Sequence, residues 1–271
     1  MATTASDFAR RRNLWFAITL IAFLAHNFWI YVIVVGALLL ITAARETNKA
    51  ALFFLLLFAV PPIQAEISGL GVIQHFFSIH YLRLLSLTIL LPAFLDLRKR
   101  AVAEGAKRSN ADMILAAYLI LNLLLQLNVD TLTNTLRYGF YTFIDVVLPY
   151  YVVSRSLKDI QSFRDALMSF VVAGMILAII GFFEFGKHWL LYSSIEDALN
   201  VPWSYGKYLE RDGGLRAVAS TGQAIVLGYV MAVAVGIFLF LKKSVPSRAT
   251  WMIGLAQLMA GLLAPLSRGP W

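Results

Sequence analysis

Two short arginine motifs near the end of the chain contain the side chains best suited to bind an anion. The first is Gly214-Leu215-Arg216, which precedes a polar run and then an apolar stretch. The second is Ser267-Arg268-Gly269, which closes the last apolar stretch. Arginine is always charged, and its planar fork of donors matches phosphate oxygens. Arg216 and Arg268 are therefore the candidate ligands of a phosphate or pyrophosphate group.

Charged side chains within or beside apolar stretches form a second group of candidates. Arg83, Arg137 and Asp145 belong to this group. An acid inside a membrane-spanning stretch is a functional candidate by default. The structural alternative is that the arginines extend their charged groups to the membrane interface and that the acid pairs with a basic neighbour. We treat all three as candidate cavity residues.

The sequence contains no recognisable metal or nucleotide motif. Cysteine is absent. Glu66, His75 and His80 lie close together in the sequence, but their spacing fits no familiar metal-ligand pattern. There is also no Walker or dinucleotide-binding pattern. We therefore expect no metal and no cofactor.

These candidates belong to an unusually apolar chain. Of its 271 residues, 60% are hydrophobic and 14% are charged, whereas a soluble domain carries about 25% charged residues. This composition predicts an all-α, polytopic bundle of transmembrane helices, formed by residues 1–271 as one domain. The net charge of +8 could indicate a nucleic-acid partner, but the basic residues lie in short clusters between apolar runs. The expected partner is a lipid bilayer, not a nucleic acid.

The apolar stretches are long enough to predict helices that cross the bilayer, which takes about 20 residues each. The clear stretches are residues 50–65, 80–97, 113–127, 138–153, 163–183, 222–241 and 250–266. Residues 14–43 are too long for one upright span and are interrupted by His26 and Asn27. They form either two short helices that meet at this pair or one long tilted helix.

The basic clusters decide the expected orientation. Lys and Arg concentrate in cytoplasmic loops. Two spans in residues 14–43 keep the arginines at 10–12 on the same side as Arg45 and Lys49, whereas one span would separate them. The sequence thus predicts about nine spans, with the N-terminus inside and the C-terminus outside. If residues 14–43 form one span, only the N-terminus changes side.

The longest polar connection, residues 186–221, is then an outer loop. It is rich in Trp and Tyr, which favour the lipid headgroup layer. Ser193 and Glu196 have the spacing of a capping box. We expect a short helix from about 194 to 199 that lies along the membrane surface. Because two spans separate Arg216 from Arg268, both side chains can face one outer cavity.

The sequence resembles the O-antigen ligase and O-antigen polymerase superfamily of bacterial membrane glycosyltransferases. The resemblance covers most of the chain and is best from Tyr150 to the end. It depends on the outer loop that ends in Gly214-Leu215-Arg216 and continues through Ser220-Thr221-Gly222-Gln223, on the basic turn Lys242-Lys243, and on the closing Ser267-Arg268-Gly269. The order of these three features along the chain carries more weight than any one of them.

The resemblance implies a multi-pass protein of the bacterial inner (cytoplasmic) membrane. Such an enzyme transfers a glycan from undecaprenyl pyrophosphate to an acceptor hydroxyl on a glycan, lipid or protein. The reaction takes place at the periplasmic face, without a cofactor, during synthesis of lipopolysaccharide or another cell-envelope polysaccharide. Arg216 and Arg268 would bind the pyrophosphate and stabilise the charge that develops on it.

The chain departs from the family pattern after Arg268. In the family, a histidine in a large outer loop beyond this motif serves as the base, whereas the sequence ends at Trp271. We therefore expect the catalytic histidine to lie beyond Trp271, and these residues alone to be inactive. Two alternatives stay open: a transporter or flippase for a lipid-linked glycan, and a non-catalytic membrane subunit.

Overall fold

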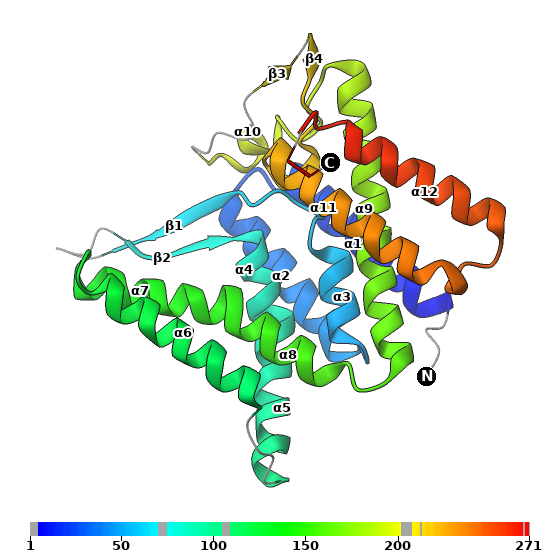
Figure 1. Ribbon diagram of the computed structural model, residues 1–271. Coiled ribbons are helices and arrows are strands. Elements are labelled where there is room, and N and C mark those ends of the chain that lie inside the picture. Colours follow the sequence, from blue (N-terminus) through cyan, green and yellow to red (C-terminus); the bar gives the residue numbers. More distant parts are fainter. Residues whose placement is uncertain are drawn as a thin grey trace.

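The computed structural model describes residues 5–69, 75–104, 109–201, 208–211, 213–267 and 269–270. The chain is mostly helical (Figure 1), as its composition predicts. The helices are α1 (Ala5–Leu24), α2 (Phe28–Ala44), α3 (Lys49–Leu56), α4 (Tyr81–Leu85), α5 (Leu91–Ala103), α6 (Asn110–Gln126), α7 (Leu132–Thr142), α8 (Leu148–Ser156), α9 (Ile160–Lys187), α10 (Ile195–Leu199), α11 (Ala224–Phe240) and α12 (Arg248–Leu263).

The stretch 14–43 forms two helices, which confirms the first of the two interpretations. Helix α1 ends at Leu24 and α2 begins at Phe28. His26 adopts a positive φ of 53°. The side chain of Asn27 caps α2 by accepting hydrogen bonds from the main-chain N–H groups of Trp29 and Ile30. The helix can break at this polar pair because the Asn27 side chain accepts hydrogen bonds from the first main-chain N–H groups of α2. In a continuous helix, those groups would donate to carbonyls of the preceding turn.

The stretch 50–65 does not form the single long helix that its composition predicts. Helix α3 stops at Leu56, after 8 residues, and the chain then runs without helix to strand β1 (Gln64–Ser68). The main-chain carbonyls of Leu56, Phe58 and Ala59, at and just after the end of this helix, accept hydrogen bonds from side-chain hydroxyls. The donors are Tyr81, Ser220 and Thr19, respectively. Hydroxyls from three distant segments thus replace helical hydrogen bonds, an effect that local composition cannot reveal.

Among the residues that the structure describes, two helices are long and apolar enough to cross a bilayer: Ile160–Lys187, and Ala224–Ser244, which joins α11 to a terminal 3-10 turn. Two other helical segments are continuous but carry several charges. The first joins α4 to α5 through a π-helical turn, η1 (Ser86–Leu90). The second joins α7 to α8 through η2 (Phe143–Val147). Both correspond to stretches that the sequence predicts as helical.

Helix α9 is the centre of one half of the bundle, where it contacts α3, α11 and α12. Small residues allow the helices to approach closely. A Cβ on Gly174 would lie 2.9 Å from the Cβ of Ala234 on α11. A Cβ on Gly261 of α12 would lie 2.5 Å from the Cβ of Ala178 on α9. Helices that pack through small residues in this way gain van der Waals contact along their backbones.

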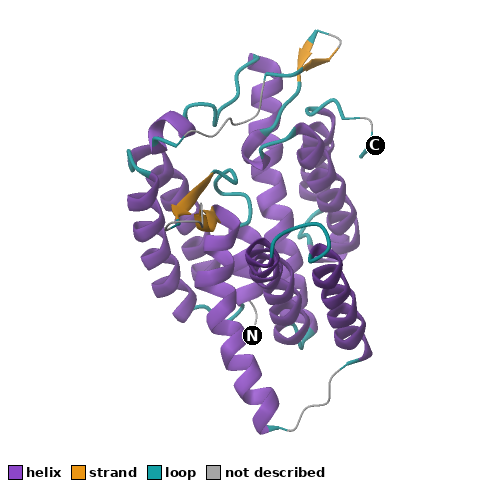
Figure 2. Cartoon of the chain, turned by 90° about the vertical axis from the view of Figure 1, so that its left-hand side faces the viewer, coloured by secondary structure: helices purple, strands orange, loops and turns teal. Residues whose placement is uncertain are grey.

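Helix α6 lies at the opposite edge of the bundle and differs from α9. It is apolar over most of its 17 residues, yet none of them is buried. Ile114 is 70% exposed and Leu124 is 55% exposed. Figures 1 and 2 show the helix at the periphery, beside α7 and away from α9. An apolar helix with no buried side chain requires an apolar environment outside the chain.

The all-α prediction misses two small antiparallel sheets. Strand β1 pairs with β2 (His75–His80), and Gln64 lies opposite His80. Strand β3 (Glu210–Arg211) pairs with β4 (Gly214–Leu215). Both sheets occur in connections between helices, where pairing satisfies main-chain groups that no helix can satisfy. The prediction is correct for the bundle and wrong for these connections.

The short helix in the loop 186–221 is confirmed as α10, but the expected capping box is absent. Ser193 donates to the carbonyl of Leu190 instead of capping the helix. Ser194 is the N-cap residue and makes no side-chain capping bond. We call the end of the bundle that carries residues 188–201, 208–211 and 213–223 the loop end (Figure 1).

The N-terminal arginines are not all exposed to solvent, as a basic cluster in a cytoplasmic loop would be. The side chain of Arg11 is 2% exposed. It donates to both carboxylate oxygens of Glu46, at 3.2 and 2.8 Å, and to Asp165 of α9 at 3.0 Å. Arg10 donates to the same carboxylate at 2.7 Å. This network joins α1, the α2–α3 turn and α9.

The network has a clear consequence for the acid at its centre. Burial by itself would raise the pKa of Glu46, but hydrogen bonds from Arg11 and Arg10 reverse this effect and lower the pKa below its ordinary value of 4.5. The stabilisation from Glu46 is therefore complete above the pKa of the unfolded chain. It is lost as the pH falls through the lower pKa of the folded protein.

We predict that Glu46→Gln lowers the free energy of unfolding by about 3–5 kcal/mol, because it leaves Arg11 buried with only part of its counter-charge. Thermal or denaturant unfolding between pH 3 and 7 measures this loss, which should shrink at the acid end of the range. Glu104→Gln, at an exposed position, is the matched control. Equal unfolding curves for the two variants would contradict the role of Glu46 as the counter-charge of buried Arg11.

Candidate functional site

Arg216 lies at the loop end, just before the start of α11. Its Nε donates to the carbonyl of Pro265 at 3.1 Å, and its Nη2 donates to Oγ of Ser267 at 2.8 Å. Its main-chain N–H donates to the carbonyl of Leu209 at 2.8 Å. The guanidinium is half-buried and is thus held at the end of α12.

The two arginine motifs are brought together through the main chain around them. The N–H of Ala217 donates to the carbonyl of Ala264, and Arg211 donates to the carbonyl of Leu266 at 2.7 Å. Gly214 lies against the side chain of Leu266, so that a Cβ there would be 3.2 Å away. The segments that carry the two motifs therefore meet. Arg268 itself lies outside the described residues.

Glu184 holds the segment after Arg216 in place. It is completely buried near the end of α9. Its Oε2 accepts hydrogen bonds from the N–H groups of Val218 and Ala219, at 2.9 and 2.8 Å, and its Oε1 accepts one from Leu191 at 3.0 Å. One carboxylate therefore fixes both sides of the long loop. The sequence marks Glu184 only as an acid near the end of an apolar stretch.

The chain between Arg216 and α11 is also tightly fixed. Oγ of Ser220 donates to the carbonyl of Phe58, just after α3, and the Thr221 hydroxyl donates to the carbonyl of Val218 at 2.8 Å. Gly222 follows with a φ of 80°, a conformation that glycine adopts without strain. The Ser-Thr-Gly run therefore shapes the turn into α11. It does not contribute a free hydroxyl.

The three candidate cavity residues do not lie together in one cluster. Arg83 and Asp145 form an ion pair, in which Nη2 and Nε of the arginine lie 3.0 and 3.1 Å from Oδ2. Nη1 of Arg83 donates to the carbonyl and the hydroxyl of Ser78, both at 2.7 Å. Its guanidinium carbon lies 3.6 Å above the ring of Tyr141. Arg83 is only 9% exposed, so these contacts hold its charged group inside the protein.

Arg137 lies apart from this pair. Its Nη2 donates to the carbonyl of His75 on β2, and its Nη1 donates to the side chain of Asn134. It therefore ties helix α7 to the β1–β2 hairpin. Of the three candidates, Arg83 and Asp145 are paired and Arg137 is separate.

The Arg83–Asp145 pair lies beside the two π-helical turns. Asp145 belongs to η2, and η1 begins three residues after Arg83. Such turns occur often at functional sites, because the extra residue redirects neighbouring side chains. Here the geometry lets Asp145 reach across to the other helix. The ion pair is neutral overall, and the described donors of Arg83 are used within the protein.

The two arginine sites differ in their chemistry. No described carboxylate pairs with Arg216, and its Nη1 has no partner among the residues that the structure describes. Arg83 has its counter-charge in Asp145. An added anion would therefore find an unbalanced positive charge at Arg216 and a neutral pair at Arg83.

Comparisons with protein-family models, with curated proteins and with solved structures found no match to this chain. The case for a function therefore depends on the geometry of the site and on the sequence features above.

We predict that Glu184→Gln loosens the loop end, because an amide has one accepting oxygen in place of two. The loss of at least one buried hydrogen bond should cost about 1–3 kcal/mol. Amide hydrogen exchange should rise at Leu191, if the amide oxygen keeps the bonds from Val218 and Ala219, or at those two residues if it does not, and protease cleavage within residues 188–201 should accelerate. Glu210→Gln, at an exposed position, should change neither. Unchanged exchange in the Glu184 variant would contradict this role.

Proposed function

We propose that this chain is a multi-pass membrane protein with about nine spans, its N-terminus in the cytoplasm and its C-terminus in the periplasm. Two helices with the length and composition of membrane spans support this proposal. The apolar and unburied helix α6 supports it independently, because the hydrocarbon core of a bilayer is the environment that such a helix requires.

The broken α3 is compatible with a position in the bilayer. Non-helical backbone is tolerated at membrane depth only where protein covers it and its polar groups are satisfied. Ala59, Val60 and Ile63 are buried, and side-chain hydroxyls satisfy the carbonyls of Phe58 and Ala59. In the proposed topology, the third of the spans is therefore a short helix continued by non-helical chain.

The absence of cysteine provides a direct test of the orientation, since any introduced cysteine is the only thiol. In intact cells, a membrane-impermeant maleimide should label Trp189→Cys at the loop end. It should label Lys243→Cys, between α11 and α12, only after the cells are opened. Both positions are exposed. The reverse pattern, or equal labelling, would refute the proposed orientation.

We further propose that Arg216 binds the pyrophosphate of an undecaprenyl-linked glycan, as expected for an O-antigen ligase-like glycosyltransferase. Arg268 is proposed as its partner from the sequence. The observation that carries this proposal is the contact of Arg216 with Ser267, which joins the two arginine motifs at one end of the bundle. The guanidinium has donors left over and lacks a described counter-charge, as an anion site requires.

The proposed reaction places the negative charge where Arg216 can stabilise it. The acceptor hydroxyl oxygen forms a bond to the anomeric carbon of the donor sugar, and the bond from that carbon to the pyrophosphate oxygen breaks. The hydroxyl proton passes to a base. Undecaprenyl pyrophosphate leaves with the bonding electrons, and a fixed cation at this position lowers the barrier.

We predict that purified chain in detergent binds undecaprenyl pyrophosphate more tightly than undecaprenyl phosphate. Arg216→Gln should weaken pyrophosphate binding about 10-fold to 100-fold, because hydrogen bonds to a charged group contribute about 1.5–3 kcal/mol. The affinity of Arg216→Lys for the pyrophosphate should lie between that of the unaltered chain and that of Arg216→Gln, since lysine keeps the charge but loses the planar fork. Isothermal titration or thermophoresis measures these affinities.

The matched control is Lys187→Gln, which removes an exposed positive charge near the same end of α9. Its affinity should change less than twofold at physiological salt, where exposed charges are screened. Thermal unfolding of each variant separates loss of binding from loss of folding. Equal affinities for the two lipids in a folded chain, or equal effects of Arg216→Gln and Lys187→Gln, would remove the proposed site.

Movement of a lipid-linked glycan across the membrane is the second candidate function. The interrupted α3 and the pairing of buried Arg83 with Asp145 favour it, because transporters often use broken helices and charges within the bundle along their pathway. Translocation moves a labelled donor between leaflets without forming a glycosidic bond. An assay of both products in the same vesicles distinguishes the two functions.

A further inference from the structure

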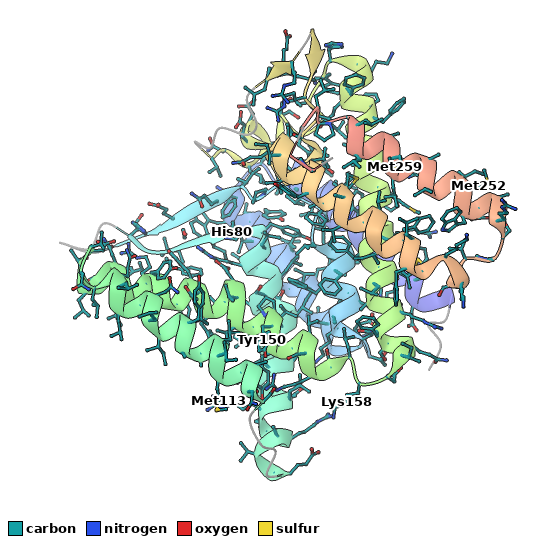
Figure 3. All side chains as sticks on the ribbon, in the orientation of Figure 1. His80, Met113, Tyr150, Lys158, Met252 and Met259 are labelled. Atoms are coloured by element: carbon teal, nitrogen blue, oxygen red, sulfur yellow. The ribbon has the colours of Figure 1, made fainter. Side chains whose placement is uncertain are left out.

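A groove of about 900 Å³ lies between helices α5, α6 and α8. Its walls are mostly apolar and include Phe94 of α5, Ala116 and Ile120 of α6, and Val147 just before α8. Met113 and Tyr150, which lie on facing walls, are marked in Figure 3. The volume falls in the range of ligand-binding cavities, about 300–1,000 Å³. The groove is separate from the loop-end site around Arg216.

One part of the groove is charged. Asp112 and Arg155 form an ion pair with 2.5 Å between Oδ2 and Nη2, and the Tyr150 hydroxyl donates to the same carboxylate at 3.0 Å. The guanidinium of Arg155 also lies 3.9 Å above the ring of Tyr151. These contacts fix the pair and make it neutral. The groove-lining Arg98 has no ion-pair partner among the described residues, so it leaves one unbalanced positive charge.

The apolar walls need an occupant that is itself apolar. No side chain of α6 is buried, although this helix forms one wall of the groove. The wall spans about 12 Å from Asp112 to Ile120, at 1.5 Å per residue. An occupant that matches both parts of the groove has a long apolar chain and one anionic group.

We propose that the groove binds an anionic phospholipid of the inner leaflet, with its acyl chains along α6 and its phosphate at Arg98. In the proposed orientation, Arg98 lies at the cytoplasmic end of its span, where anionic headgroups are found. Basic pockets between helices on the cytoplasmic side bind such headgroups. The inference depends on the proposed membrane insertion but not on glycan transfer.

Native mass spectrometry of the full chain tests this proposal. Delipidated protein in detergent is titrated with phosphatidylglycerol and with phosphatidylcholine of the same acyl chains. The chain should retain phosphatidylglycerol in preference to phosphatidylcholine. Arg98→Gln should reduce this preference about fivefold, the ratio that corresponds to about 1 kcal/mol for one basic residue at an anionic membrane. Lys243→Gln removes an exposed charge outside the groove and should leave the preference unchanged.

A second pair of variants tests the apolar walls. Ala116→Trp fills the groove and should reduce the retention of both lipids, whereas Ile114→Trp adds the same side chain to an exposed position outside the groove and should not. Each variant is first checked for folding by thermal unfolding. Arg98→Gln should leave the affinity for undecaprenyl pyrophosphate intact, so failure here is distinguishable from failure of the pyrophosphate site.

Three results would overturn the proposal. The first is equal retention of the two lipids by the unaltered chain. The second is an equal effect of Arg98→Gln and Lys243→Gln. The third is a shift from dimer to monomer in Ala116→Trp with lipid retention unchanged, because a second copy of the chain would then be the occupant.

Discussion

The carboxylate of Glu184 accepts three main-chain hydrogen bonds in a completely buried position, and the geometry of the loop end depends on it. These bonds fix the chain on both sides of the long connection between α9 and α11. The same hydrogen bonds restrict the position of Arg216, because Val218 and Ala219 lie only two and three residues after it. The main-chain donors offset part of the cost of burying this acid, and no ion pair joins it to Arg216 among the described residues. The positive charge of Arg216 is therefore left for another anion.

Satisfaction of main-chain groups also explains the least regular part of the bundle. Where α3 ends, the hydroxyls of Thr19, Tyr81 and Ser220 donate hydrogen bonds to main-chain carbonyls that leave the helical pattern. The segment before α11 is thus connected to the end of α3 as well as to α9. This arrangement links the candidate site to the centre of the bundle, so that the turn at residues 216–222 is positioned by contacts from three directions.

Buried charges are paired where they join helices. Arg11 connects α1 to Glu46 and Asp165, and Arg83 connects the α4–α5 segment to Asp145 of the α7–α8 segment. Both arginines are almost completely buried, and removal of one partner from such a pair is costly. Their role is to hold helices together. The contrast with Arg216 shows why an arginine without a described counter-charge is the better candidate for binding a ligand.

The sequence by itself determined the helical class and the short helix in the long loop, it favoured a break at His26 and Asn27 over one continuous helix, and it placed Arg216 and Ser267 near the ends of two apolar stretches. These features follow from apolar stretches, local capping and the order of the helices. Only the tertiary structure decided that α3 stops at Leu56, that Arg83 pairs with Asp145, and that Glu184 holds the loop. The reason is physical: each of these depends on a hydrogen bond or ion pair between residues distant in the sequence, whose distances are fixed only when the helices pack.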